Sequence, residues 1–450
     1  MNNIKLFCKR DFSPSYFYCM RIYFFQWLLM LALGGGVMAQ FKTDTLLGKI
    51  LRSDTSSLLE KMLGNPEKYR IQIIYTQIDR DADNHPSFRN YYYHVSRDFY
   101  FYPASTVKLP LAMLSLEKLH HLSLKGVDKF TRMAYDSSYS GQSALIRDST
   151  SGSGYPSIAQ FIRKAFLISD NDAYNRMYEF VGQKYLNRRL HALGYPDICI
   201  VRQFMPLTEL ENRHTNALRF LDDRGHIIYE QPAAFNRDSL RFSPEVKLGI
   251  GYLNAQDSLI KEPMDFTRHN RIPLEDLQQM LQSALFPLSV PESRRFRLSR
   301  QDDAFLYRYL SQYPSETPFP KYDTTVFMDS YVKFFFQDTG RRMPANMRVF
   351  NKAGWAYGFL SDVSYIVDFN NQTEFMLTAT VYTNEDGILN DNVYEYESMG
   401  LPFLYRVGQA IYRYDRNRPR KCKPDLSNFW LKYEHRDPAD TRPSIKIVDN

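Results

Sequence analysis

The chain has 450 residues, of which 44% are hydrophobic and 15% aromatic, and its formal net charge is +7. This length and apolar content allow one large core or two smaller ones, which excludes an intrinsically disordered protein. The first 39 residues contribute +3 and the segment from Arg413 to the end +4, so the body is near neutral. No nucleic-acid-binding module is therefore predicted. The basic stretch from Arg416 to Lys423 is interpreted as solvated, with contact to an anionic envelope surface as the alternative.

The N-terminus has the pattern of a cleaved export signal. Met20-Arg21 precedes an apolar run over residues 22–33, and the small-residue site Val37-Met38-Ala39 places the mature start at Gln40. An uncleaved anchor is the competing interpretation, although the run is short for a bilayer span. Residues 1–19 are superfluous to the signal, which suggests a mis-assigned start. We therefore expect a periplasmic or secreted protein with no stable membrane span after cleavage.

Hydrophobic periodicity predicts strands near both chain ends and helices between them. In chain order, the predicted helices are 40–63, 109–119, 157–167, 173–181, 183–193, 273–285, 301–310 and 394–412. The predicted strands are 69–75, 91–95, 349–352, 361–368 and 374–382. Residues 213–270 have weaker periodicity and are interpreted as an insertion or a long surface excursion. The order predicts an α/β (α+β) fold, in which an antiparallel sheet from both chain ends is flanked by helices and carries an inserted all-helical lobe.

Signal cleavage leaves two cysteines, Cys199 and Cys422. They could pair in an oxidising compartment, but the sequence does not show that they meet. The simpler interpretation is one small buried residue and one thiol in the tail. The nine histidines have no zinc-like spacing, so neither a metal nor an organic cofactor is predicted.

Three short motifs stand in one order along the chain: Ser105-Thr-Val-Lys108, Ser169-Asp-Asn171 and Lys352-Ala-Gly354. The first alone discriminates little, because Ser-x-x-Lys recurs three times and usually reflects a helix N-cap with a solvated lysine. In the functional interpretation, Ser105 and Lys108 share a helical face, so the amine can take the hydroxyl proton and make Ser105 a nucleophile.

The second and third motifs supply the other parts of an acyl-transfer site. Ser169 would pass a proton to the leaving nitrogen, and Asn171 would hold Lys108 and the substrate amide; the alternative is an ordinary helix-connecting turn. Lys352 would attract a substrate carboxylate, or would only solubilise a strand edge. Gly354 would let a substrate backbone approach, and the Trp355 N–H would join the Ser105 N–H as oxyanion donors.

These residues resemble the penicillin-recognising serine hydrolases, and most closely the class A β-lactamases. The resemblance extends to their context, covers roughly residues 45–415 and implies a two-lobed fold with an acyl-enzyme on Ser105. It implies that Lys108 is the general base or its relay, that Ser169 shuttles the proton, and that Lys352 anchors the substrate carboxylate. The implied organisation is a signal peptide over 1–39, a hydrolase domain over 40–415 with the insertion at 213–270, and a basic tail over 416–450.

The sequence departs from the family pattern in two places. Ala353 stands where the family usually has Thr or Ser, which removes a hydroxyl that could bind a β-lactam carboxylate. The family also expects a deacylating glutamate followed shortly by Leu-Asn, after the Ser-Asp-Asn helices. Glu209 and Glu211 are the candidates in this region, and Glu211 is the one predicted to act in deacylation, although neither has the usual surroundings. Without that base, the protein would acylate well and turn over poorly.

Three functions are compatible with the motifs. The leading one is an exported, β-lactamase-like serine hydrolase acting on a small-molecule or peptide substrate, either a β-lactam or a peptidoglycan-derived compound. The second is a cell-wall peptide or ester hydrolase, or a penicillin-binding protein, that acylates but deacylates slowly. The third is a non-catalytic ligand-binding or sensing domain, against which the intact Ser105, Lys108, Ser169 and Lys352 argue. A monomer is expected.

Overall fold

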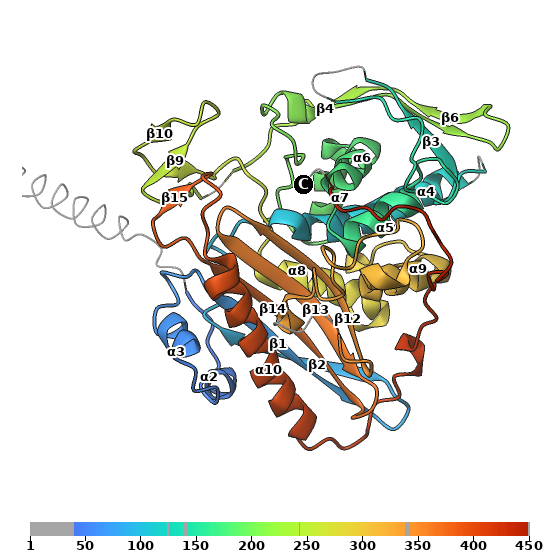
Figure 1. The fold of residues 1–450 in the computed structure, drawn as a ribbon. Helices are drawn as coiled ribbons and strands as arrows, with labels where there is room; N and C mark the ends of the chain where they lie inside the picture. The colour runs from blue at the N-terminus through green and yellow to red at the C-terminus, as the bar shows by residue number, and fades with distance from the viewer. Residues whose placement is uncertain (1–39, 124–125, 138–141, 243, 338–342, 449–450) are drawn as a thin grey trace, which may run out of the picture. The chain divides into compact units, whose positions relative to one another are not determined.

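In the computed structural model, which describes residues 40–123, 126–137, 142–242, 244–337 and 343–448, both chain ends contribute to one five-stranded antiparallel sheet (Figure 1). The strand order is β12-β13-β14-β1-β2, formed by β12 Met347–Ala356, β13 Phe359–Asp368, β14 Thr373–Tyr382, β1 Gln72–Arg80 and β2 Pro86–Tyr93. β1 pairs with β14, with Tyr75 opposite Leu377. The predicted sheet from both chain ends is confirmed, whereas the signal predicted over 1–39 lies outside the described residues.

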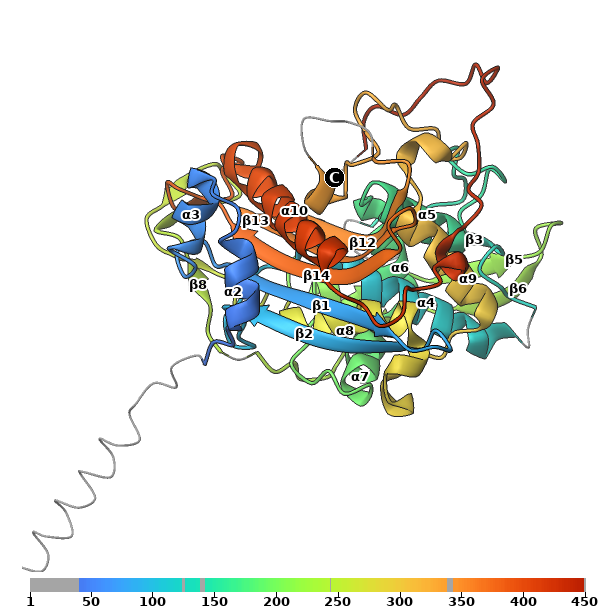
Figure 2. The ribbon, with the colours of Figure 1, turned by 90° about the horizontal axis from the view of Figure 1, so that it is seen from below.

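Helices cover both faces of the sheet (Figure 2). One face carries α10 Leu401–Asn417, with α2 Thr45–Leu51 and α3 Ser57–Leu63 beside it, and the other carries α8 Leu274–Leu285 and α9 Arg300–Ser311. The sequence predicted one helix over 40–63, but the structure has two. The break falls at the polar residues before α3, where the Ser56 side chain accepts the Leu59 N–H at 3.3 Å and caps the second helix.

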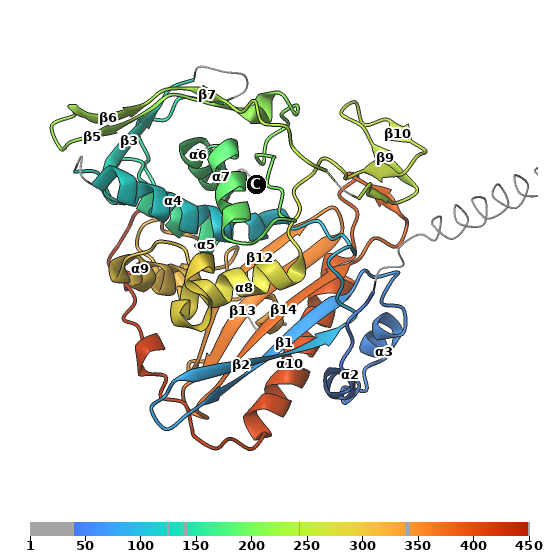
Figure 3. The same ribbon diagram turned by 180° about the vertical axis from the view of Figure 1, so that it is seen from behind.

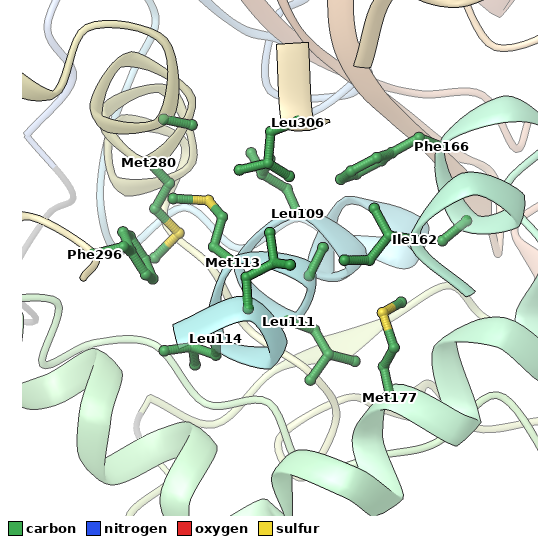
Figure 4. Packing of buried hydrophobic residues seen from close by; sticks show 14 of the residues in the cluster. Leu109, Leu111, Met113, Leu114, Ile162, Phe166, Met177, Met280, Phe296 and Leu306 are labelled. Carbon is green, nitrogen blue, oxygen red and sulfur yellow. The ribbon is translucent and has the colours of Figure 1, made fainter. Parts of the chain in front are cut away.

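The predicted helical lobe consists of α4 Lys108–Leu122, α5 Ile158–Leu167, α6 Asn171–Val181 and α7 Gln183–Ala192. α4 runs through its centre, and every residue from Lys108 to Glu117 is buried. Figure 4 shows Leu111 and Met113 of α4 packed among Ile162, Met177 and Met280, which come from three other helices. A helix enclosed on all sides can hold a polar group at its N-terminus in one place and away from water.

Residues 213–270 are not one excursion but a series of short strands: β4 His214–Thr215, β5 Leu218–Leu221, β6 Ile227–Gln231, β7 Ala234–Phe235, β8 Lys247–Leu248, β9 Gly251–Leu253, β10 Leu259–Ile260 and β11 Met264–Asp265. β5 and β6 form a sheet with β3 Arg132–Tyr135, and β9 and β10 form another with β15 Ile388–Leu389 (Figure 3). Most of these strands are too short to show an alternating pattern in the sequence.

The C-terminal stretch packs onto the body: Arg416, Lys421 and Lys423 of its basic run are exposed, as predicted, but Arg418 and Arg420 are not. Arg418 donates to Asp415 at 2.9 Å and to Asp79 at 2.5 Å, and its side chain is only 4% exposed. Phe429 is buried in the main core, with its ring centroid 4.8 Å from that of Tyr365. Opposite charges inside the fold and one aromatic anchor therefore hold this stretch in place.

Truncation of the Phe429 side chain is expected to destabilise the whole fold. Phe429→Ala should lower the free energy of unfolding by about 3–5 kcal/mol, because it leaves a cavity between the sheet and the helices. Trp430→Ala is the matched control, since this neighbouring ring is 67% exposed. Urea unfolding followed by intrinsic fluorescence measures both changes. Equal, small effects of the two substitutions would show that the tail does not contribute to the core.

Two further findings concern membrane-spanning helices and the cysteines. Within the described ranges, no helix combines the length and the apolar character needed to cross a bilayer. Cys199 and Cys422 are both free thiols. Burial raises the pKa of the Cys199 thiol to about 12, so this thiol stays protonated and unreactive at neutral pH.

Candidate active site

Ser105 and Lys108 are adjacent in space at the N-terminus of α4. Ser105 lies in the 3₁₀ turn Ala104–Val107, and Lys108 is the first residue of α4. Lys108 Nζ is 2.8 Å from Ser105 Oγ. Ala104 has φ of 44°, a left-handed conformation that is uncommon for a residue with a Cβ and is often found at functional sites. The local sequence thus places a lysine amine against the serine hydroxyl.

The Ser169-Asp170-Asn171 turn surrounds the same amine. Lys108 Nζ is 2.7 Å from Asn171 Oδ1, 2.5 Å from the Ser169 carbonyl oxygen and 3.2 Å from Ser169 Oγ. Ser169 has φ of 65°, which directs both of its oxygens to the lysine. Asp170 caps α6 by accepting the Ala173 N–H at 2.8 Å, so its role is to fix the turn.

The surroundings of Lys108 favour its neutral form. Burial, together with the charge of Lys352, holds the pKa of the Lys108 amine well below its ordinary value, although Asp170 opposes the shift. A neutral amine has a lone pair that can accept the Ser105 proton. Lys108 therefore has the position of a general base, and its lowered pKa favours the neutral form that such a base needs.

Lys352 reaches the site from the edge strand β12 and is 1% exposed, so it is not a solubilising edge residue. Its Nζ is 2.9 Å from Ser169 Oγ and 2.5 Å from the Ala353 carbonyl oxygen. Ser169 Oγ thus contacts the amines of both lysines, as a proton shuttle requires. Burial and the charge of Lys333 lower the pKa of Lys352 to about 7, against the attraction of Asp362.

Gly354 allows β12 to touch the turn that carries the nucleophile. A Cβ at this position would lie 2.6 Å from the Ser105 nitrogen and 2.9 Å from the Thr106 nitrogen. The group that approaches Gly354 is thus the Ser105 turn itself, whereas the sequence suggested a substrate backbone.

Trp355 lies at the end of β12, just before the two-residue turn Tyr357-Gly358 that joins β12 to β13. Trp355 lies opposite Leu360, in the second residue pair from this turn. In a hairpin with a two-residue turn, the residues of the second pair do not hydrogen-bond to each other, so the Trp355 N–H points away from β13, to the free edge of the sheet. Ala353, two residues earlier on β12, has the same orientation, and its carbonyl accepts a hydrogen bond from Lys352 Nζ at that edge. This is the orientation that an oxyanion donor facing Ser105 needs.

The structure does not bring Glu211 to Ser105. The Glu211 carboxylate accepts the Thr208 N–H at 2.6 Å, and Glu209 is paired with Arg268 at 2.5 Å. The loop residue that reaches the site is Phe204, whose ring centroid lies 4.9 Å from Lys108 Nζ. Asn175, one turn after Asn171 on α6, accepts the Phe204 N–H at 2.8 Å and fixes it there.

A pocket of about 550 Å³ opens over Ser105. Its wall is rich in aromatic rings, contributed by Tyr102, Phe204, Trp355, Tyr357, Tyr394 and Tyr396. Among the described residues that line it, none is Asp or Glu. Ala353 is fully buried in the apolar cluster on the α10 side of the sheet and does not line the pocket.

Sequence reasoning missed several residues of this wall, among them Arg202, Gln203 and His269. They carry no motif, and they meet because the chain returns to the same place after the 213–270 segment, where Cys199 pairs with Arg271. The spacing of Asn171 and Asn175 on one helical face was the one available signal that α6 holds a second loop at the site.

The two lysines predict an unusual pH dependence of acylation. The rate should rise with pH through the lowered pKa of Lys108, because the base must be neutral. For a substrate with a carboxylate it should fall again above about 7, where Lys352 loses its charge. Second-order rates for benzylpenicillin and for the uncharged 4-nitrophenyl acetate, measured from acid to alkaline pH, check this. Identical profiles for the two substrates would contradict the anchoring role of Lys352.

Comparison with known sequences finds one family that this chain resembles. The sequence model of the β-lactamase enzyme family matches residues 61–225, a segment that contains Ser105, Lys108 and Ser169. No curated protein sequence gave a significant match. The predicted resemblance to the penicillin-recognising serine hydrolases is thereby confirmed for this segment.

Solved β-lactamase structures are similar over most of the chain, at low identity. A β-lactamase from Xanthomonas campestris is 14% identical, with 83% of this chain and 98% of that chain covered and a TM-score of 0.44. A β-lactamase from Francisella tularensis is 16% identical, with 78% and 96% covered and a TM-score of 0.42. A class A β-lactamase from Clostridium kluyveri is 13% identical, with 79% and 96% covered and a TM-score of 0.43.

Proposed function

We propose that this chain is an exported serine hydrolase that forms an acyl-enzyme on Ser105 and cleaves β-lactams or related amides, including peptidoglycan-derived ones. The observation that carries the proposal is the 2.8 Å contact between Ser105 Oγ and the buried Lys108 amine, whose pKa is lowered. A lysine with a lowered pKa can take the serine proton, so no histidine is needed as the base.

In the proposed reaction, Ser105 Oγ attacks the amide carbonyl and its proton passes to Lys108. The Ser105 and Trp355 N–H groups stabilise the oxyanion. Ser169, in contact with both lysine amines, delivers a proton to the leaving nitrogen, and the C–N bond breaks. The acyl group stays on Ser105 until water removes it, while Lys352 holds a carboxylate on the leaving side.

A second function, acylation with slow release, is favoured by one specific observation. Phe204 occupies the loop position nearest Lys108, and the described pocket wall contains no carboxylate that could activate water. A penicillin-binding protein or a cell-wall peptide or ester hydrolase, inhibited rather than consumed by β-lactams, would behave in this way.

One experiment separates these functions. The chain from Gln40 onward and its Ser105→Ala variant are tested for hydrolysis of a chromogenic cephalosporin and for a penicilloyl adduct by intact mass. Turnover that the variant lacks supports the hydrolase, and a long-lived adduct without turnover supports slow release. Absence of both, with these compounds and with peptide amides and esters, would leave only the non-catalytic binding domain. N-terminal sequencing of the exported product tests cleavage before Gln40.

A further inference from the structure

One wall of the pocket carries three polar side chains that the proposed reaction does not use. Arg202, Gln203 and His269 all line it, together with Tyr102 and Tyr357. The charge of Arg202 acts on Tyr102, Tyr357 and His269, whereas Lys352 contacts Ser169. The pocket thus has two separate sets of polar groups, one with the proton shuttle and one with Arg202.

Gln203 is buried with an unsatisfied side chain. It is 3% exposed, and among the described residues neither its Nε2 nor its Oε1 has a hydrogen-bond partner. Its backbone cannot easily shift to find one, because its N–H donates to Asn212 Oδ1 at 2.6 Å and the next N–H donates to Asn175 Oδ1 at 2.8 Å. A buried amide without partners is costly in a folded protein, and a ligand that supplies hydrogen-bond partners would offset this cost.

The His269 side chain is also buried with an unsatisfied polar atom. It is 6% exposed, and its Nδ1 has no partner in the described part of the chain. The rings of Phe266, Tyr102 and Tyr357 surround it, with centroids 4.8, 5.9 and 6.2 Å away. Burial, and then the charge of Arg202, lower the pKa of its imidazole to about 3. The imidazole is therefore neutral and offers one N–H donor and one acceptor.

Arg202 has a free guanidinium in a pocket without carboxylates. None of the ion pairs among the described residues includes it, whereas its neighbour Arg268 is paired with Glu209. Its Nε donates only to the Arg268 carbonyl at 3.3 Å. The Asn270 side chain accepts the Arg202 N–H at 2.9 Å and so fixes the backbone of this residue. A cation on a fixed backbone, with no ion-pair partner among the described residues, is suited to an anionic ligand.

We propose that Arg202, Gln203 and His269 bind a carboxylate on the acyl portion of the substrate. The proposal rests on the function given above, because Ser169 protonates the leaving group and so assigns the Lys352 side of the pocket to the leaving portion. Since Lys352 and Ser169 serve the leaving portion, we assign Arg202 and its neighbours to the part that remains on Ser105. The guanidinium, the Gln203 amide N–H and the His269 N–H would donate to the carboxylate oxygens, and Gln203 Oε1 would accept an adjacent amide N–H.

A matched pair of penicillins tests the proposal. Carbenicillin is benzylpenicillin with one additional carboxylate on the acyl side chain. We expect the ratio of the second-order acylation rates, carbenicillin over benzylpenicillin, to fall at least about tenfold in Arg202→Met, as the loss of a charged hydrogen bond predicts. In Arg202→Lys, this ratio should fall less. Arg224→Met, at an exposed arginine of the β5–β6 hairpin, should leave the ratio unchanged.

Other outcomes are distinguishable. If both penicillins acylate Ser105 and Arg202→Met leaves their ratio unchanged, the inference is wrong and the proposed function stands. If neither leaves an adduct, calorimetric binding to Ser105→Ala decides: Arg202-dependent preference for carbenicillin supports the site, and equal or absent binding overturns it. Gln203→Leu should lower the preference without lowering Tm. A lower Tm with an unchanged preference would overturn its place in the site.

Discussion

Replacement of Lys108 by methionine is expected to slow acylation of Ser105 by about 10²–10⁴-fold, the usual contribution of a general base. Methionine has nearly the same length and fits a buried position, but it has no lone pair basic enough to take the Ser105 proton. It also removes the amine that contacts Ser169 and Asn171. The second-order rate of penicilloyl adduct formation, followed by intact mass, measures the effect.

Lys118→Met is the matched control for this substitution. Lys118 lies on the same helix, is also largely buried, and donates to Gln231 at 2.8 Å, away from the pocket. Burial lowers the pKa of Lys118 to about 8, so a second lysine with a lowered pKa is removed without touching Ser105. If Lys108→Met acylated at the wild-type rate, or if both variants lost the same activity, Lys108 would not be the base.

A side chain at Gly354 is expected to have the next largest effect. Gly354→Val should slow acylation by about 10²–10³-fold, the usual effect of losing one oxyanion donor, because the new side chain pushes the Ser105 nitrogen and β12 apart. The obstacle is backbone, so no side-chain rotation relieves it. Overpacking of this kind should also cost roughly 1–3 kcal/mol of stability. Adduct formation and urea unfolding are measured on the same preparation.

Gly152→Ala provides the comparison, because a Cβ there makes only ordinary contact, 3.5 Å from the Phe319 ring. Neither glycine has a positive φ, so backbone preference does not separate the two substitutions. A Gly354→Val variant that acylates normally would show that the close approach of β12 to the nucleophile is not needed for catalysis.

The residues that could be predicted from the sequence are those whose neighbours are set locally. Ser105 and Lys108 are one helical turn apart, and Ser169 and Asn171 belong to one turn, so a short motif already specifies their geometry. Lys352 lies far along the chain, so its presence in the site was predicted only from the order of the three motifs. Their roles as base, shuttle and anchor remain predictions.

The residues that could not be predicted depend on distant contacts. Phe204 faces Lys108 because Asn175 of α6 holds its backbone, and the backbone of Arg202 is fixed by Asn270, at the end of the 213–270 segment. Glu211 has a plausible sequence context, yet its carboxylate turns to Thr208 within its own loop. A loop sequence does not state which of its side chains faces inward.

The same distinction applies to the fold. Long amphipathic segments such as α5 and α8 were placed within one residue at each end, because burial of one face repeats regularly in the sequence. The burial of Arg418 was not predicted, because charge alone does not show where a counter-charge lies. Asp415, fully buried at the end of α10, accepts from Arg418 and is also bonded to Arg420.

The pairing of β1 with β14 has a consequence for biosynthesis. More than half of the chain separates these neighbouring strands, and Phe429 completes the core still later. The nascent polypeptide cannot assemble its central sheet until almost all of it has left the ribosome, because the last strands are missing until then. For the export proposed above, the consequence is that the newly made chain should still be unfolded, with no reactive serine assembled, while it would pass through a translocation channel.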